Sequence, residues 1–83
     1  MQVVVKLFAL YRELIGTSQV CIELPDSAVV GDLCRELRRC FPALPQEPYQ
    51  LVVAVDMIYV DDDYLLQEGQ EAALIPPVSG GVC

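Results

Sequence analysis

The sequence contains no histidine, so the side chain that most often serves as a catalytic base near neutral pH is missing. Ser-His and Cys-His nucleophile pairs and histidine-ligated zinc are therefore excluded. Long apolar runs are also missing, since the longest clear one, residues 51–55, falls far short of the ~18 residues that a membrane-spanning helix needs. No basic segment, apolar stretch and cleavage site follow Met1, so no export signal is predicted. We expect a cytoplasmic protein without membrane contact.

Basic residues are scarce and unevenly placed. Residues 1–40 hold all five cations and five of the twelve anions, whereas residues 41–83 hold seven anions and no cation, which gives the whole net charge of −7. An acidic half repels nucleic-acid phosphates, so we expect no nucleic-acid binding. The charge either favours a basic protein partner or keeps an apolar small protein soluble.

Cysteines at metal-binding spacing are absent. No two of the four are two to four residues apart, as zinc knuckles require, and no run of cysteines typical of iron–sulfur clusters occurs. In a cytosolic protein they are expected as reduced thiols, with Cys21 and Cys34 acting as small core residues. No metal site and no bound cofactor is predicted.

Two charged clusters remain as candidate sites. Asp61-Asp62-Asp63 suggests a calcium or magnesium site, but consecutive side chains on a turn point apart, which favours a solvated turn. A cluster of arginines in the predicted main helix suggests an anion patch: Arg35, Arg38 and Arg39. Acidic residues lie within one helical turn of them, so ion pairs on a solvated face are the simpler interpretation.

The chain has 83 residues, of which 54% are hydrophobic, and its mean hydropathy is +0.43. This composition predicts one small folded domain and excludes intrinsic disorder. Alternating or β-branched segments predict strands at residues 3–8, 19–24, 51–55, 57–60 and 71–75. A short helix is predicted over 9–15, ending at a left-handed Gly16. The main helix, with an apolar stripe of period four, is predicted from Val29 to Phe41, with Asp26 or Ser27 as its cap.

This order predicts an α+β fold of the β-grasp (ubiquitin-like) type. It comprises a mixed four- to five-stranded sheet, one main helix, a short helix and an extended C-terminal tail. The domain is expected to span residues 1–76, followed by a flexible Gly-Gly tail at 77–83. In the first strand Phe8 points away from the core, and it either shares an outer apolar face with Tyr59 and Ile75, as partner surfaces do, or packs beneath the short helix.

The tail carries the strongest chemical signal. A stiff Pro76-Pro77 stem precedes Val78, Ser79, Gly80 and Gly81, and glycines let a partner's backbone approach closely. Such a segment can thread a narrow channel. A carboxylate at its tip can be activated by ATP as an acyl adenylate and then receive sulfur, which requires no catalytic side chain from this chain.

Several segments together resemble the small subunit of molybdopterin synthase along essentially the whole chain. They are Leu7-Phe8-Ala9, Arg12-Glu13-Leu14-Ile15-Gly16, the helix from Val29, Glu68-Gly69-Gln70-Glu71 and Pro76-Pro77-Val78-Ser79-Gly80-Gly81. In that family an E1-like adenylating enzyme uses ATP, and a sulfur donor then converts the C-terminal glycine to a thiocarboxylate. The tail enters the large synthase subunit, where the sulfur passes to the pterin precursor.

The resemblance implies specific roles and a non-catalytic carrier that works within a heterotetramer. Gly81 would be the adenylated and sulfur-carrying residue, and Gly80, Ser79, Val78 and Pro77 would thread the partner. The contact surface would comprise Phe8, Tyr59 and Ile75.

Alternative functions remain at this point. The chain could be a sulfur carrier of thiamine or cysteine synthesis, or a ubiquitin-like binding module that is never activated. Val82 and Cys83 depart from the family pattern, because they lock the Gly81 carbonyl in a peptide bond. Three interpretations stay open: a precursor extension removed by a peptidase, a cloning or fusion remnant, or a terminus at which Cys83 either carries a persulfide or has no role.

Overall fold

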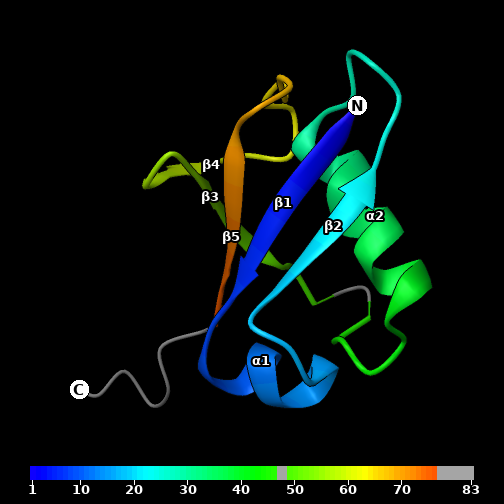
Figure 1. The fold of residues 1–83 in the computed structure, drawn as a ribbon, viewed down its shortest axis with the longest axis vertical. Helices are drawn as coiled ribbons and strands as arrows, with labels where there is room; N and C mark the ends of the chain where they lie inside the picture. Colours follow the sequence, from blue (N-terminus) through cyan, green and yellow to red (C-terminus); the bar gives the residue numbers. More distant parts are fainter. Residues whose placement is uncertain (47–48, 77–83) are drawn as a thin grey trace.

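A computed structural model describes residues 1–46 and 49–76 (Figure 1). Along them the elements are β1 (Gln2–Leu7), α1 (Ala9–Ile15), β2 (Gln19–Glu23), α2 (Val30–Cys40), β3 (Val52–Val55), β4 (Ile58–Val60) and β5 (Glu71–Ile75). The strands of this described part form one five-stranded sheet in the order β2-β1-β5-β3-β4. β1 and β5 are parallel, and the other neighbours are antiparallel. The predicted β-grasp fold is confirmed, with a five-stranded sheet.

The predicted element boundaries agree closely with the structure. α1 and β5 begin and end where predicted, and the bounds of the other elements differ by one residue. The prediction that Asp26 or Ser27 caps the main helix is wrong, because α2 begins only at Val30. No helix within the described ranges is long and apolar enough to span a membrane.

The core lies between the sheet and α2. Every second residue of β1 and β5 is buried, and these residues share one face of the sheet because neighbouring side chains alternate along a strand: Val3, Val5, Leu7, Ala72 and Leu74. The apolar stripe of α2 packs on this face through Val30, Leu33, Cys34 and Leu37. Figure 1 shows α1 at the end of the sheet where β1 and β5 finish. We call the face opposite α2 the open face.

The start of α2 is fixed by the long loop between β4 and β5. The backbone N–H of Val30 donates to the carbonyl of Tyr64 at 3.0 Å, and that of Gly31 donates to the carbonyl of Asp62 at 2.8 Å. These bonds satisfy two of the N–H groups that a helix leaves unpaired at its beginning. The cap combines these distant carbonyls with one local side chain, since the Asp32 carboxylate accepts a hydrogen bond from the N–H of Val29 at 3.0 Å. Neither Asp26 nor Ser27 takes part in it.

Positive φ angles occur at the end of α1 and in the turn between β3 and β4. Gly16 ends α1 with φ of 92°, and its N–H donates to the carbonyl of Arg12 at 2.8 Å, so the predicted left-handed cap is confirmed. Between β3 and β4, Asp56 and Met57 have φ of 50° and 69°. A two-residue hairpin turn favours positive φ at both central positions, and glycine is the usual second residue. Methionine therefore holds a strained conformation here.

Replacing Gly16 with alanine should lower the free energy of unfolding by about 1 kcal/mol, because a Cβ disfavours the left-handed conformation. Gly31→Ala is the matched control, since its Cβ would meet Asp62 no closer than 3.4 Å and alanine favours the helix. Urea unfolding of both variants gives the comparison. Equal stability of Gly16→Ala and the unaltered protein would contradict the assignment of the cap.

Replacing Met57 with glycine should raise the free energy of unfolding by about 0.5–1 kcal/mol, because it relieves the positive φ and leaves an Asp-Gly turn. The Met57 side chain is 98% exposed, so little packing is lost. Met57→Ala removes the same side chain while keeping the strain, and it should give no comparable gain. A loss of stability in Met57→Gly, measured by thermal unfolding, would show that the turn is not strained.

Candidate functional site

A hollow in the open face brings together the three residues predicted as the partner surface. Phe8, Tyr59 and Ile75 all line it, although they come from the end of β1, from β4 and from β5. The Phe8 side chain is 48% exposed and that of Tyr59 is 72% exposed. Phe8 is therefore not packed away beneath α1, and the interpretation of a shared outer apolar face is the one that agrees with the structure.

The floor of the hollow is set by the register of four adjacent strands. Lys6 of β1 lies opposite Ala73 of β5, Ala73 lies opposite Ala54 of β3, and Ala54 lies opposite Tyr59 of β4. Directly opposed residues point to the same face of a sheet, so these four side chains form one row across the open face. Two alanine methyl groups lie between two long side chains, and the surface is hollowed at that point.

Charged groups surround the apolar floor. Lys6 and Glu71 form an ion pair of 3.7 Å between Nζ and Oε2, with both side chains partly exposed to solvent. Such a pair contributes at most about 1 kcal/mol to stability, so partner groups can replace it at low cost. Asp56 lies on the turn beside the hollow and is exposed. The site is an apolar surface with a polar rim, as at many protein interfaces.

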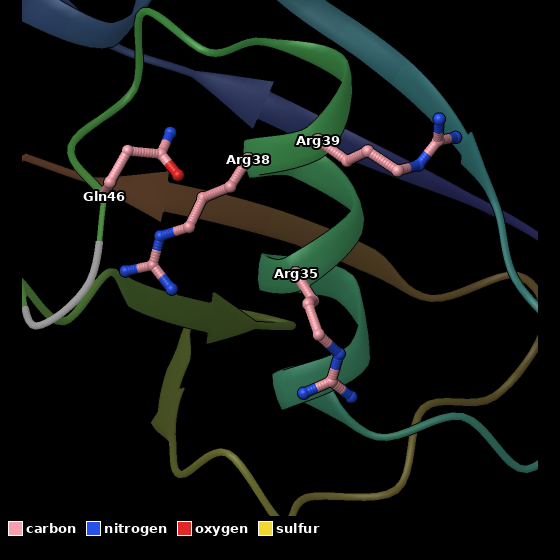
Figure 2. Close-up of a pocket in the computed structure, with 4 residues that line it drawn as sticks. All are labelled: Arg35, Arg38, Arg39 and Gln46. Atoms are coloured by element: carbon pink, nitrogen blue, oxygen red, sulfur yellow. The ribbon is translucent and has the colours of Figure 1, made fainter.

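The arginines of α2 do not form a common anion site. Arg35 forms an ion pair with Asp32, and Arg39 forms one with Glu36. Arg38 donates to backbone carbonyls of the loop after α2. Figure 2 shows that the three guanidinium groups point in different directions from the helix. The simpler interpretation, a face of paired charges, agrees with this geometry.

The turn at residues 61–63 contacts the start of α2 through a backbone hydrogen bond. Asp61, Asp62 and Asp63 are exposed, and the carbonyl of Asp62 accepts the hydrogen bond from α2 described above. Within residues 1–46 and 49–76, no three acidic, cysteine or histidine side chains are placed to hold a metal ion.

The cysteines differ in environment. Cys34 is buried as predicted, and desolvation raises the pKa of its thiol to about 11, which keeps it protonated near neutral pH. The prediction that Cys21 belongs to the core is wrong. Cys21 lies opposite Val4 on the open face of β2 and is exposed, because the alternation of that strand buries Ile22.

The predicted carrier residues follow β5 along the chain. Pro77, Val78, Ser79, Gly80 and Gly81 all lie outside the described residues, so their roles stay predictions. β5 ends at Ile75 and Pro76 is described directly after it. The parallel register places Leu74 opposite Leu7, next to Phe8. The chain therefore leaves the sheet beside the hollow.

Six residues that line the hollow were not assigned to it from the sequence: Lys6, Ala54, Asp56, Met57, Glu71 and Ala73. The alternation of β5 places Ala73 on the same face as Ile75, so a signal for that residue was present in the sequence. The two alanines come together only through the pairing of β3 with β5. Local pattern carries no information about such a register between distant strands.

Comparisons with known proteins agree with the fold. The ThiS family model matches residues 5–81. The molybdopterin synthase sulfur carrier subunit of Chlamydomonas reinhardtii is 39% identical over 83 residues, covering 98% of this chain and 100% of that protein. SAMP1 from Haloferax volcanii has a TM-score of 0.85 and 29% identity, covering 98% of this chain and 100% of its own.

A further solved structure is a complex of subunits 1 and 2 of the molybdopterin-converting factor from Helicobacter pylori. One of its chains matches this protein with a TM-score of 0.60 and 25% identity, covering 98% of this chain and 100% of its own. The relatives therefore share both the fold and nearly the full extent of the sequence. The chain belongs to the ThiS family, and its relatives include proteins named molybdopterin synthase sulfur carrier subunits.

Proposed function

We propose that this chain is a sulfur carrier for molybdenum cofactor biosynthesis, with Gly81 as the residue that carries the sulfur. The observation that carries the proposal is the match of the ThiS family model through Gly81, together with the name shared by the relatives. The domain itself supplies a docking surface, and its partners supply the catalytic groups. The place of action is the cytoplasm.

The proposed chemistry takes place at the Gly81 carboxylate. An E1-like partner joins this carboxylate to the α-phosphate of ATP, which forms an acyl adenylate and releases pyrophosphate. Hydrosulfide then attacks the carbonyl carbon, a C–S bond forms, the bond from carbon to the phosphate oxygen breaks, and AMP leaves. No redox step is needed with sulfide as donor. The product is a thiocarboxylate, which donates its sulfur to the pterin precursor within molybdopterin synthase.

The large synthase subunit is the proposed second partner, in a heterotetramer of two small and two large subunits. The complex of subunits 1 and 2 from Helicobacter pylori supports this pairing. One chain of that complex matches 98% of the length of the present chain. The hollow of the open face lies where the chain leaves β5, so a partner bound there also meets the carrier segment. Pro77, Val78, Ser79 and Gly80 then extend toward the partner's reaction centre.

A form of the protein that ends at Gly81 should gain about 16 Da when it is incubated with the adenylating enzyme, ATP and sulfide, because sulfur replaces one carboxyl oxygen. Intact-mass spectrometry measures the change. Omission of ATP is the control and should leave the mass unaltered. An unaltered mass in the complete reaction, with an enzyme that still exchanges pyrophosphate into ATP, would refute the proposal.

Full-length protein should not form the thiocarboxylate unless a peptidase removes Val82 and Cys83, because the Gly81 carbonyl is held in a peptide bond. Full-length protein, Cys83→Ser and the form ending at Gly81 are compared in molybdopterin synthesis with the large subunit. Activity is expected only for the last of these. Activity of unprocessed full-length protein that Cys83→Ser abolishes would instead assign the sulfur to a Cys83 persulfide.

Replacing Phe8 with aspartate should weaken binding to the large subunit by at least about tenfold, since a carboxylate would be buried in the interface without a partner. The fold should persist, because Phe8 is half exposed. Ile58→Asp is the control: Ile58 is exposed on β4, but it lies opposite the buried Val55 and so belongs to the other face. Calorimetry and far-UV circular dichroism test both variants, and equal affinity of Phe8→Asp and unaltered protein would exclude this surface.

A further inference from the structure

We propose that the hollow of the open face receives one bulky apolar side chain from the large synthase subunit, with a cationic residue of that subunit beside it. The inference rests on the proposed function and specifies how the interface is made. It assigns a specificity-determining role to Ala54 and Ala73, which form the floor of the hollow.

The dimensions of the hollow fit a side chain. Its volume is about 360 Å³, whereas one water molecule takes up about 30 Å³ of liquid. Ala73 and Ala54 lie directly opposite each other on β5 and β3, so the floor consists of two methyl groups and the backbone of two strands. A larger residue at either position would raise the floor and reduce this space. The strand register thus places two small residues side by side, and the hollow, which we also call the socket, lies above them.

The walls of the hollow are apolar and already exposed. Phe8 and Ile75 lie toward the end where the chain leaves β5, and Tyr59 stands at the edge strand β4. Met57, on the strained turn, is 98% exposed. Covering apolar surface of this kind favours binding, because it is removed from water. A leucine, methionine or phenylalanine side chain placed over the two alanines would contact apolar walls of the hollow, as the central residues of interfaces do.

The charges at the rim favour a cation beside that apolar side chain. Lys6 is engaged with Glu71, and the Asp56 carboxylate has no ion-pair partner among residues 1–46 and 49–76. The rim therefore holds one uncompensated negative charge. The second half of the chain adds no cation, since all five lie within residues 1–40. A partner surface with arginine or lysine next to its apolar residue complements this pattern.

The proposal is tested by substitutions that add bulk at Ala73, on the floor of the hollow. Ala73→Leu should weaken binding of the large synthase subunit by at least about tenfold in calorimetry, because its side chain occupies the space meant for the partner. Ala73→Val, with a side chain that suits strands, should give a smaller loss and serves if the leucine variant does not fold. Cys21→Leu adds bulk to β2 on the same face, outside the hollow, and should bind normally.

The outcomes separate this inference from the proposed function. If the unaltered protein binds the large subunit and folded Ala73→Leu or Ala73→Val binds equally well, the socket is refuted while the proposed function stands. If Cys21→Leu weakens binding as much as Ala73→Leu, the contact is not specific to the hollow and the inference is also refuted. If the unaltered protein does not bind at all, the proposed pairing itself fails.

The cation is tested separately. Binding of the unaltered protein should weaken with rising salt, and Asp56→Asn should weaken it at low salt and reduce that salt dependence. An unaltered salt dependence in Asp56→Asn would refute the cationic neighbour.

Discussion

The first and the last strand of the domain, β1 and β5, pair in parallel and lie side by side within the sheet, away from its edges. In this register Val5 and Leu7 point into the core with Ala72 and Leu74, while Lys6 and Ala73 point to the open face. A shift by one residue would exchange the two sets and expose the core. The burial of the inner set therefore also fixes which residues form the open face and where the chain leaves the sheet.

This constraint explains how a small domain without histidine can take part in a chemical reaction. One face of the sheet is used for stability, because α2 covers it and buries the aliphatic side chains. The other face stays available, and its apolar part lies over β5, β3 and β4, whereas β2 contributes Gln19, Cys21 and Glu23. The proposed division of labour follows from this arrangement: the domain docks, and the partners act on the segment that leaves β5.

Much of the fold could be predicted because its signals are local. The period-four stripe of α2, the helix formers and Gly16 of α1, and the alternation of β2 and β5 each fit within one element. The interactions that escaped prediction connect distant segments. Two N–H groups at the start of α2 bond to the carbonyls of Asp62 and Tyr64, and the floor of the hollow depends on the pairing of β3 with β5. Phe8, Tyr59 and Ile75 could be assigned to one face once the strand pairing of the β-grasp fold was assumed, whereas the neighbouring alanines gave no chemical signal.

The most direct test of the central claim, that partners dock on the apolar part of the open face, is an NMR titration of labelled, unaltered protein with the large synthase subunit. Amide signals of Phe8, Met57, Tyr59, Ala73 and Ile75 should shift or broaden most, and those of α2 (Val30–Cys40) should change little. The largest changes along α2, with the open face unaffected, would contradict the account.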